Sequence, residues 1–126
     1  MKRVLIVDDQ DTIRKMLRLT LSGRYELHEA AEAAEAWDML RRLRPEAMIL
    51  DIMMPGEMDG YQLCEKLKAD GELRATHVVM VTARGQEADR QKGIAAGADA
   101  YFVKPFSPLA LARHLEASLP AREAAR

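Results

Sequence analysis

The residues best suited to chemistry are five polar side chains that each follow a short apolar segment. They are Asp8, Asp9, Asp51, Thr82 and Lys104. Carboxylates that are gathered in one place repel one another, which raises their pKa values or requires a cation. Hard carboxylate oxygens with room for water suit Mg²⁺. If the fold brings these side chains together, the sequence predicts a magnesium site beside a hydroxyl and an ammonium group.

Each of these residues also has an ordinary structural explanation. Asp8 and Asp9 could cap the helix that follows them, and an Asp after a strand is often a turn former. Thr82 could cap a later helix, and Lys104 could simply be solvated. The functional interpretation therefore depends on whether one fold places all of them at the same edge of a sheet.

Apolar runs alternate with helical stripes along the chain. The apolar runs predict buried strands at 4–7, 25–30, 47–51, 77–81 and 100–103. The stripes predict five helices. The first runs from Asp11, a suitable N-cap, to Leu21, and the second covers 33–43 and carries Trp37 as a core residue. The third is opened by Asp59-Gly60, the fourth runs to about Ile94 and is stopped by Gly97, and the fifth is opened by Ser107-Pro108. The pattern is that of an α/β protein.

The order of these elements determines how the sheet is built. Connections between successive strands are too long for hairpins, so we expect a doubly wound, five-stranded parallel sheet with helices on both faces. Parallel strands place all their carboxyl ends at one edge, where ligands bind in open α/β sheets. The five polar side chains should therefore converge.

Composition narrows the class of protein. A chain of 126 residues is one ordinary domain, expected over 3–119, and 120–126 lacks an apolar face and should be a solvated tail or the start of a linker. A net charge of −1 supplies no positive field for direct binding to nucleic acid or to a membrane. Cys64 is the only cysteine and should be a small core residue. With no apolar segment long enough for a signal peptide or a membrane span, we expect a cytoplasmic protein.

Four motifs together resemble the receiver domain of bacterial response regulators in two-component signalling, of the chemotaxis-regulator type. They are Val7-Asp8-Asp9, residues 50–55, Thr82-Ala83 and Lys104-Pro105-Phe106, and the resemblance extends to Asp59-Gly60 and residues 97–101. It covers nearly the whole chain. The resemblance implies a flavodoxin-like (βα)5 fold with strand order 2-1-3-4-5, and a signalling phosphoacceptor rather than a conventional enzyme.

The roles of the family carry over by position. The resemblance implies that Asp51 takes a phosphoryl group from the phosphohistidine of a sensor histidine kinase or of a phosphotransfer protein, and that water later removes it. It implies that Mg²⁺ is held by the carboxylates of Asp9 and Asp51 and the backbone carbonyl of Met53, with Asp8 acting mainly through a metal-bound water. It also implies that Lys104 precedes a cis proline.

The resemblance further implies a catalytic set and a switch. Asp51, Thr82 and Lys104 would be the catalytic residues, and the backbone of Met53 and Ala83 would bind the phosphoryl group with them. Thr82 and Tyr101 would relay phosphorylation to an output surface for a downstream effector. That surface comprises the helix that ends near Ile94, the strand 100–103 and the last helix.

Two departures from the family pattern bear on partners. Gly56-Glu57-Met58 adds one residue between Pro55 and Asp59, so the loop should bulge near the site. Ala100 stands where an acidic residue is frequent in the transcription-factor branch, which removes a charge that helps to pair two domains. A homodimer through the output surface is therefore expected to be weak.

Two other functions fit less of the sequence. An aspartate-nucleophile phosphohydrolase usually carries Asp-x-Asp after its first strand, whereas Asp8 and Asp9 are adjacent here. A phosphorylation-independent interaction module would be expected to lack part of the acidic set, and this chain has all of it. The three histidines, His28, His77 and His114, fall on separate elements without ligand spacing, so we expect structural or surface roles for them rather than metal binding.

Overall fold

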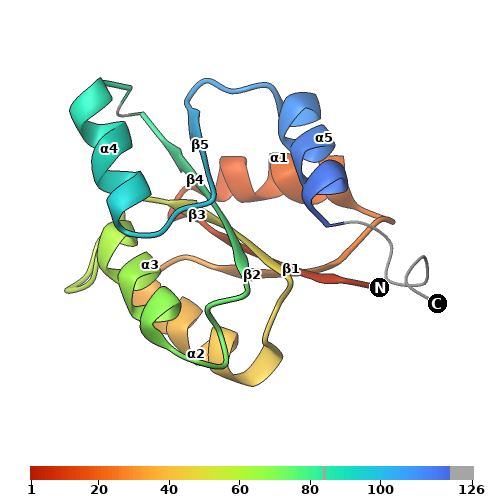
Figure 1. Ribbon diagram of the computed structural model, residues 1–126. Coiled ribbons are helices and arrows are strands. Elements are labelled where there is room, and N and C mark those ends of the chain that lie inside the picture. The colour runs from red at the N-terminus through yellow and green to blue at the C-terminus, as the bar shows by residue number, and fades with distance from the viewer. Residues whose placement is uncertain (84, 120–126) are drawn as a thin grey trace.

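Five parallel strands lie in the order β2-β1-β3-β4-β5 in the computed structural model, which describes residues 1–83 and 85–119 (Figure 1). The strands are β1 (Arg3–Val7), β2 (Glu26–Ala30), β3 (Ala47–Asp51), β4 (His77–Thr82) and β5 (Ala100–Val103). The helices are α1 (Asp11–Leu21), α2 (Ala33–Leu43), α3 (Gly60–Ala69), α4 (Glu87–Ala95) and α5 (Pro108–Ser118). The flavodoxin-like fold and strand order are as predicted. The predicted tail, 120–126, lies outside the described residues.

The two faces of the sheet carry separate apolar clusters, because successive side chains of a strand point to opposite sides. Leu5 packs in one cluster with residues of α2 and α3, and Ile6 packs in the other with residues of α1 and α5. Figure 1 shows α2 and α3 below the sheet and α1 and α5 together on its other side. A fully buried side chain such as Leu50 stabilises the fold by about 1.5–3 kcal/mol. The strands that carry the site are thus held from both sides.

Two helices begin as their sequences indicate. The hydroxyl of Ser107 accepts a hydrogen bond from the amide of Ala110 at 3.1 Å and caps α5. Asp59 caps α3, accepting from the amide of Gln62 at 2.9 Å, while the Gln62 side chain accepts from the amide of Asp59. Each cap supplies a partner to an amide that the helix cannot satisfy. The start of α3, which adjoins β3, is therefore well defined.

The start of α1 differs from its prediction. Asp11 is the first helical residue, and Gln10 occupies the N-cap position without a side-chain cap. The carboxylate of Asp8 instead accepts a hydrogen bond from the amide of Gln10 at 2.8 Å. This bond satisfies an amide just before the helix. Asp8 therefore serves the turn into α1 as well as the edge of the sheet.

Three further sequence predictions can be compared with the structure. Gly97 follows α4 with φ of +105°, a conformation that favours glycine, and this confirms it as the stop. Cys64 is fully buried and burial raises the pKa of its thiol to about 11, as fits a core residue. Trp37 is half-buried and packs against an apolar cluster, with the Lys66 ammonium 4.4 Å from its ring centroid, so it is a partly covered residue of the core rather than a fully buried one. Trp37 packs at the margin of the cluster that contains Leu40.

The histidines show a contact that spacing did not indicate. The Nε2 atoms of His77 and His114 lie 2.9 Å apart, joining the start of β4 to α5. His28 pairs instead with Glu26 at 2.7 Å. Their assignment as structural or surface groups rather than metal ligands stays a prediction. Among the residues that the structure describes, none of the helices has the length and apolar character needed to cross a membrane.

Candidate functional site

Three carboxylates meet at the carboxyl edge of the sheet. Asp8 directly follows β1 and Asp51 is the last residue of β3, while Asp9 extends the turn toward α1. One carboxylate oxygen from each lies within 4.8 Å of the others. Asp8 and Asp51 are only 2% and 4% exposed, whereas Asp9 is exposed to solvent. The fold thus brings together three residues that lie up to 43 positions apart.

Lys104 supplies the positive charge at this edge. Its ammonium lies 3.1 Å from Oδ2 of Asp8, 3.3 Å from Oε1 of Gln10 and 3.7 Å from Oδ1 of Asp51. The peptide bond between Lys104 and Pro105 is cis, as the family resemblance implied. Gln10 was missed by the sequence analysis, because a single glutamine after an Asp pair has no distinctive spacing. The ammonium of Lys104 is therefore closer to Asp8 and Gln10 than to Asp51.

The electrostatics of the site favour an added cation. Burial, and next the charge of Asp8, raise the pKa of Asp51 from its usual 3.8 to about 6, against the opposing effects of Lys104 and the Met53 amide. That amide is 3.4 Å from Oδ1 of Asp51. Three carboxylates face one ammonium, so negative charge is in excess. Carboxylate oxygens are the ligands that hard divalent cations prefer, and this donor set fits one.

Thr82 and Ala83 lie at the same edge. Thr82 is the last residue of β4, is fully buried, and its carbonyl accepts a hydrogen bond from the amide of Lys104 at 2.7 Å. Ala83 follows it and is exposed. Because β3 and β4 pair in register from Ala47 to Asp51, Thr82 lies one residue beyond the partner of Asp51. Thr82 therefore ends β4 at the edge where Asp51 ends β3.

Tyr101 lies away from the edge and against a helix. It pairs with Met80 in the middle of β4 and is half-buried. A Cβ placed on Gly93 would lie 2.9 Å from the ring of Tyr101, so the ring packs directly on α4. A change at this side chain would therefore be felt by α4.

Gly60 holds α3 close to the site, a role that spacing alone did not single out. Its amide donates to the carbonyl of Ile52 at 3.1 Å. A Cβ at this position would lie 2.7 Å from the carbonyl oxygen of Asp51 and 2.7 Å from Cα of Ile52. The only sequence signal was the Asp59-Gly60 pair at the start of the helix. Glycine is needed here for close approach of two backbones.

The loop that precedes α3 contains the extra residue noted in the sequence. Gly56 has φ of +110° and Pro55, Gly56 and Glu57 are exposed. The loop and the start of α2, at Ala33, line a cavity of about 630 Å³. The spacing from Asp51 to Pro55 is unaffected. The longer loop thus changes the surface beside the site rather than the site itself.

The fold and the acidic edge together define a class of protein. Comparison with known sequences identifies this class. The sequence model of the response regulator receiver domain matches residues 4–116. The chain belongs to this family, the receiver domains of two-component response regulators, and the resemblance drawn from its motifs is confirmed. It is a signalling module rather than a conventional enzyme.

Individual relatives agree with this assignment. The transcriptional regulatory protein SrrA of Staphylococcus aureus (strain NCTC 8325 / PS 47) is 41% identical over 117 residues, which make up 92% of this chain and 47% of that protein. The chain therefore spans about half the length of the curated relatives it matches.

Solved structures show the same fold. Chemotaxis protein CheY4 of Vibrio cholerae is 33% identical with a TM-score of 0.86, over 94% of this chain and 99% of that chain. The BeF3-activated DrrB receiver domain is 26% identical with a TM-score of 0.87, over 94% of this chain and 97% of that chain.

Proposed function

We propose that this domain accepts a phosphoryl group on Asp51 from the phosphohistidine of a sensor histidine kinase or of a phosphotransfer protein. The observation that carries the proposal is the cluster of three carboxylates with Lys104 at the carboxyl edge. Asp51 is the nucleophile because it is the buried carboxylate at the end of the central strand, and Thr82 lies one residue beyond its partner on β4. An aspartate-nucleophile phosphohydrolase would carry its nucleophile after β1, and a phosphorylation-independent interaction module would need no nucleophile. Both alternatives account for less of this arrangement.

The chemistry follows from the groups present. An oxygen of the Asp51 carboxylate attacks phosphorus in line, and the phosphorus–nitrogen bond breaks with its electron pair staying on the ring nitrogen. The imidazole leaves as a neutral group because the other ring nitrogen of the phosphohistidine carries a proton. Lys104, the hydroxyl of Thr82 and the amides of Met53 and Ala83 bind the phosphoryl oxygens. The phosphoryl group is later removed by hydrolysis. Water attacks the same phosphorus, the Asp51 oxygen leaves as a carboxylate, and phosphate is released.

A divalent cation, which we propose is Mg²⁺, would be held by Asp8, Asp9, Asp51 and the carbonyl of Met53. When bound, it would neutralise negative charge on the carboxylates and on the phosphoryl oxygens. Phosphorylation should then depend on the cation, because uncompensated carboxylates would repel an incoming phosphate.

The proposal is tested with a small phosphodonor. Wild-type protein incubated with acetyl phosphate and Mg²⁺ is expected to gain one phosphoryl group by intact-protein mass spectrometry, and hydroxylamine should release it as expected for an acyl phosphate. A chelator in excess of Mg²⁺ should abolish the gain. Protein that incorporates nothing with either acetyl phosphate or phosphoramidate, or that is labelled equally in the presence of chelator, would contradict the proposal.

The second part of the proposed function is a switch through Thr82 and Tyr101 to the surface of α4, β5 and α5. Thr82 makes a charge-assisted hydrogen bond to the phosphoryl group only in the phosphorylated state, and a ligand shifts an equilibrium only through such a difference. A bond of about 1.5–3 kcal/mol corresponds to a population shift of about ten- to hundredfold. The contact of the Tyr101 ring with Gly93 supports a relay to α4.

We expect the NMR signals of the Tyr101 ring to shift when beryllofluoride, a phosphoryl mimic, is added to the Mg²⁺-loaded wild-type protein. The shift should be lost or much reduced in Thr82→Ala. A matched control is Thr76→Ala, which removes another buried threonine whose hydroxyl donates to the carbonyl of Pro45 before β4 begins. Equal shifts in wild type and Thr82→Ala would contradict the relay, and no shift in any variant would make Tyr101 a packing residue only.

The partners follow from this mechanism. The histidine kinase lies upstream, and a downstream effector binds the surface of α4, β5 and α5, where Ile94 and Val103 are 46% and 42% exposed. A weak homodimer through the same surface, and a cytoplasmic location, stay predictions. Domain bounds of 3–119 are consistent with the family match to residues 4–116.

A further inference from the structure

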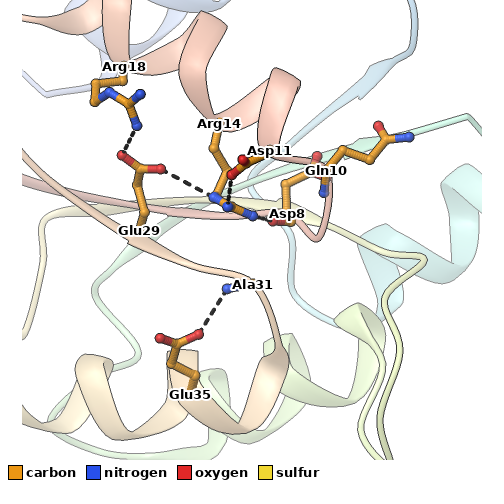
Figure 2. Close-up of polar contacts among 8 residues, drawn as sticks. All are labelled: Asp8, Gln10, Asp11, Arg14, Arg18, Glu29, Ala31 and Glu35. Atoms are coloured by element: carbon orange, nitrogen blue, oxygen red, sulfur yellow. Dashed lines mark hydrogen bonds and ion pairs between the residues drawn. The ribbon is translucent and has the colours of Figure 1, made fainter.

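Arg14 of α1 makes three polar contacts beside the acidic cluster (Figure 2). Its Nη1 atom donates a hydrogen bond to the backbone carbonyl of Asp8 at 2.6 Å. Its Nε atom donates to Oε1 of Glu29 at 3.2 Å, and its Nη2 atom pairs with Asp11. The side chain of Arg14 is only 16% exposed, in contrast to most surface arginines. The guanidinium is thus fixed between α1, β2 and the end of β1.

Glu29, the partner of Arg14 on the sheet, is itself held in place by two neighbours. It belongs to β2, where it pairs in register with Ile6 of β1, and its carboxylate is also bound by Arg18. The amide of Asp8 donates to the carbonyl of Ala30, the next residue of β2, at 3.1 Å. Both polar groups of the Asp8 backbone are therefore held, the amide by β2 itself and the carbonyl by Arg14.

The carbonyl of Asp8 belongs to the peptide that joins Asp8 to Asp9. Rotation of this peptide would turn both carboxylates relative to Asp51, because the two side chains flank it. A hydrogen bond from a charged donor is about twice as strong as a neutral one, and the planar guanidinium can serve three partners at fixed angles. Arg14 therefore restrains the orientation of two of the three carboxylates of the cluster.

We propose that Arg14 is a positioning residue that holds the Asp8–Asp9 peptide in the orientation required to bind a divalent cation. The proposal rests on the proposed function, since it concerns the same cation. The charge of Arg14 and its hydrogen bond to Asp8 should have opposite effects on cation affinity. Loss of a positive charge near the site would by itself strengthen cation binding, whereas loss of the hydrogen bond to Asp8 would weaken it. This difference in sign allows the two effects to be told apart.

Arg18 provides a matched control. It binds the same Glu29 carboxylate from the next turn of α1, and the contacts drawn in Figure 2 join it to Glu29 alone. Arg14→Met and Arg18→Met each remove one arginine from the Glu29 pair while keeping an unbranched side chain. Both variants lose one positive charge at similar places in the fold. Only Arg14→Met loses the bond to Asp8.

The experiment measures Mn²⁺ binding from the EPR signal of the free ion, alongside thermal unfolding without metal. We expect Arg14→Met to bind Mn²⁺ about tenfold more weakly than wild type, as is typical when a residue that orients metal ligands is removed. Arg18→Met should bind as wild type does or slightly more tightly. Arg14→Lys keeps the charge but not the planar fork and should show a smaller loss, so it carries the test if Arg14→Met does not fold.

Unchanged or tighter Mn²⁺ binding in Arg14→Met, or in Arg14→Lys where that variant carries the test, would overturn the positioning role. So would an equal loss in Arg18→Met. Wild-type protein is treated in parallel with acetyl phosphate, as described above. Absence of label in the wild type would count against the proposed function, whereas labelled wild type with equal Mn²⁺ affinity in the Arg14 variants would count only against the role of Arg14.

Discussion

An Asp51→Asn protein is expected to incorporate no phosphoryl group from acetyl phosphate and to be more stable than wild type at neutral pH in the absence of divalent cations. The first effect follows because an amide is not a nucleophile toward phosphorus, and because Asp8, the other buried carboxylate of the cluster, is already bound by Lys104 and by the amide of Gln10. The second follows because the Asp51 carboxylate is buried beside Asp8 at a cost that the neutral amide does not have.

The pKa of Asp51 determines how the stability difference between Asp51→Asn and wild type depends on pH. The pKa of Asp51 is raised from 3.8 to about 6 in the folded protein, so folding favours the protonated carboxyl group. The stability contributed by that group is fully present below pH 3.8 and is lost as the pH rises through about 6. Above this window, Asp51→Asn should exceed wild type by on the order of 1–2 kcal/mol, after allowance for screening by solvent.

Urea unfolding at a series of pH values, with chelator present, measures the difference. It should be largest at pH values above about 6 and should shrink toward pH 4 and on addition of Mg²⁺. Asp38→Asn, which changes an exposed carboxylate of α2, serves as the control and should leave both stability and labelling close to wild type. An Asp51→Asn protein that is labelled as fully as wild type, or that is less stable at neutral pH, would contradict this account.

A Gly60→Ala substitution is expected to destabilise the protein by about 2 kcal/mol or more. The new methyl group would lie 2.7 Å from the Asp51 carbonyl oxygen and from Cα of Ile52, and both of these are backbone atoms that cannot rotate away. Overpacking of this kind costs about 1–3 kcal/mol and occasionally more. Alanine favours a helix over glycine by up to about 1 kcal/mol, which is too little to offset the clash.

Because the displaced atoms belong to Asp51 and the residue after it, this variant should also slow phosphorylation. Chemical unfolding and acetyl phosphate labelling measure the two effects. Gly71→Ala is the matched control, since nothing lies within 4 Å of its added Cβ and its φ is not positive. It should be nearly neutral. A Gly60→Ala protein as stable as Gly71→Ala would show that α3 can move away from β3 without cost.

The parts of the fold that sequence could predict are those set by local pattern. The strand 100–103 was expected with the bounds that β5 has, because a continuous apolar run ends there at Lys104. The meeting of the acidic residues with Lys104 and the end of β4 was predictable because parallel strands place their carboxyl ends together. The roles of these residues stay predictions. The start of α1 was misplaced by one residue, because the acceptor before the helix comes from Asp8 and not from Asp11.

What escaped prediction depends on contacts between separate elements. The bond between His77 and His114 joins residues 37 positions apart, and no periodicity links them. Arg14 was not singled out from the sequence, because no local pattern shows that its guanidinium joins α1 to β1 and β2. Trp37 was assigned to the interior from its place on the helical stripe, but the stripe does not show how far the neighbouring helix covers it.

The division of the interior into two apolar clusters has a consequence for how such proteins diverge. Neither cluster includes Asp8, Asp51, Thr82 or Lys104, which all lie where the sheet ends. Mutations that repack Leu5 with its neighbours, or Ile6 with its neighbours, therefore alter the balance between folded and unfolded chains without altering the reacting groups. Helical surfaces can accumulate changes that create new binding specificities in duplicated copies, while the edge retains one chemistry.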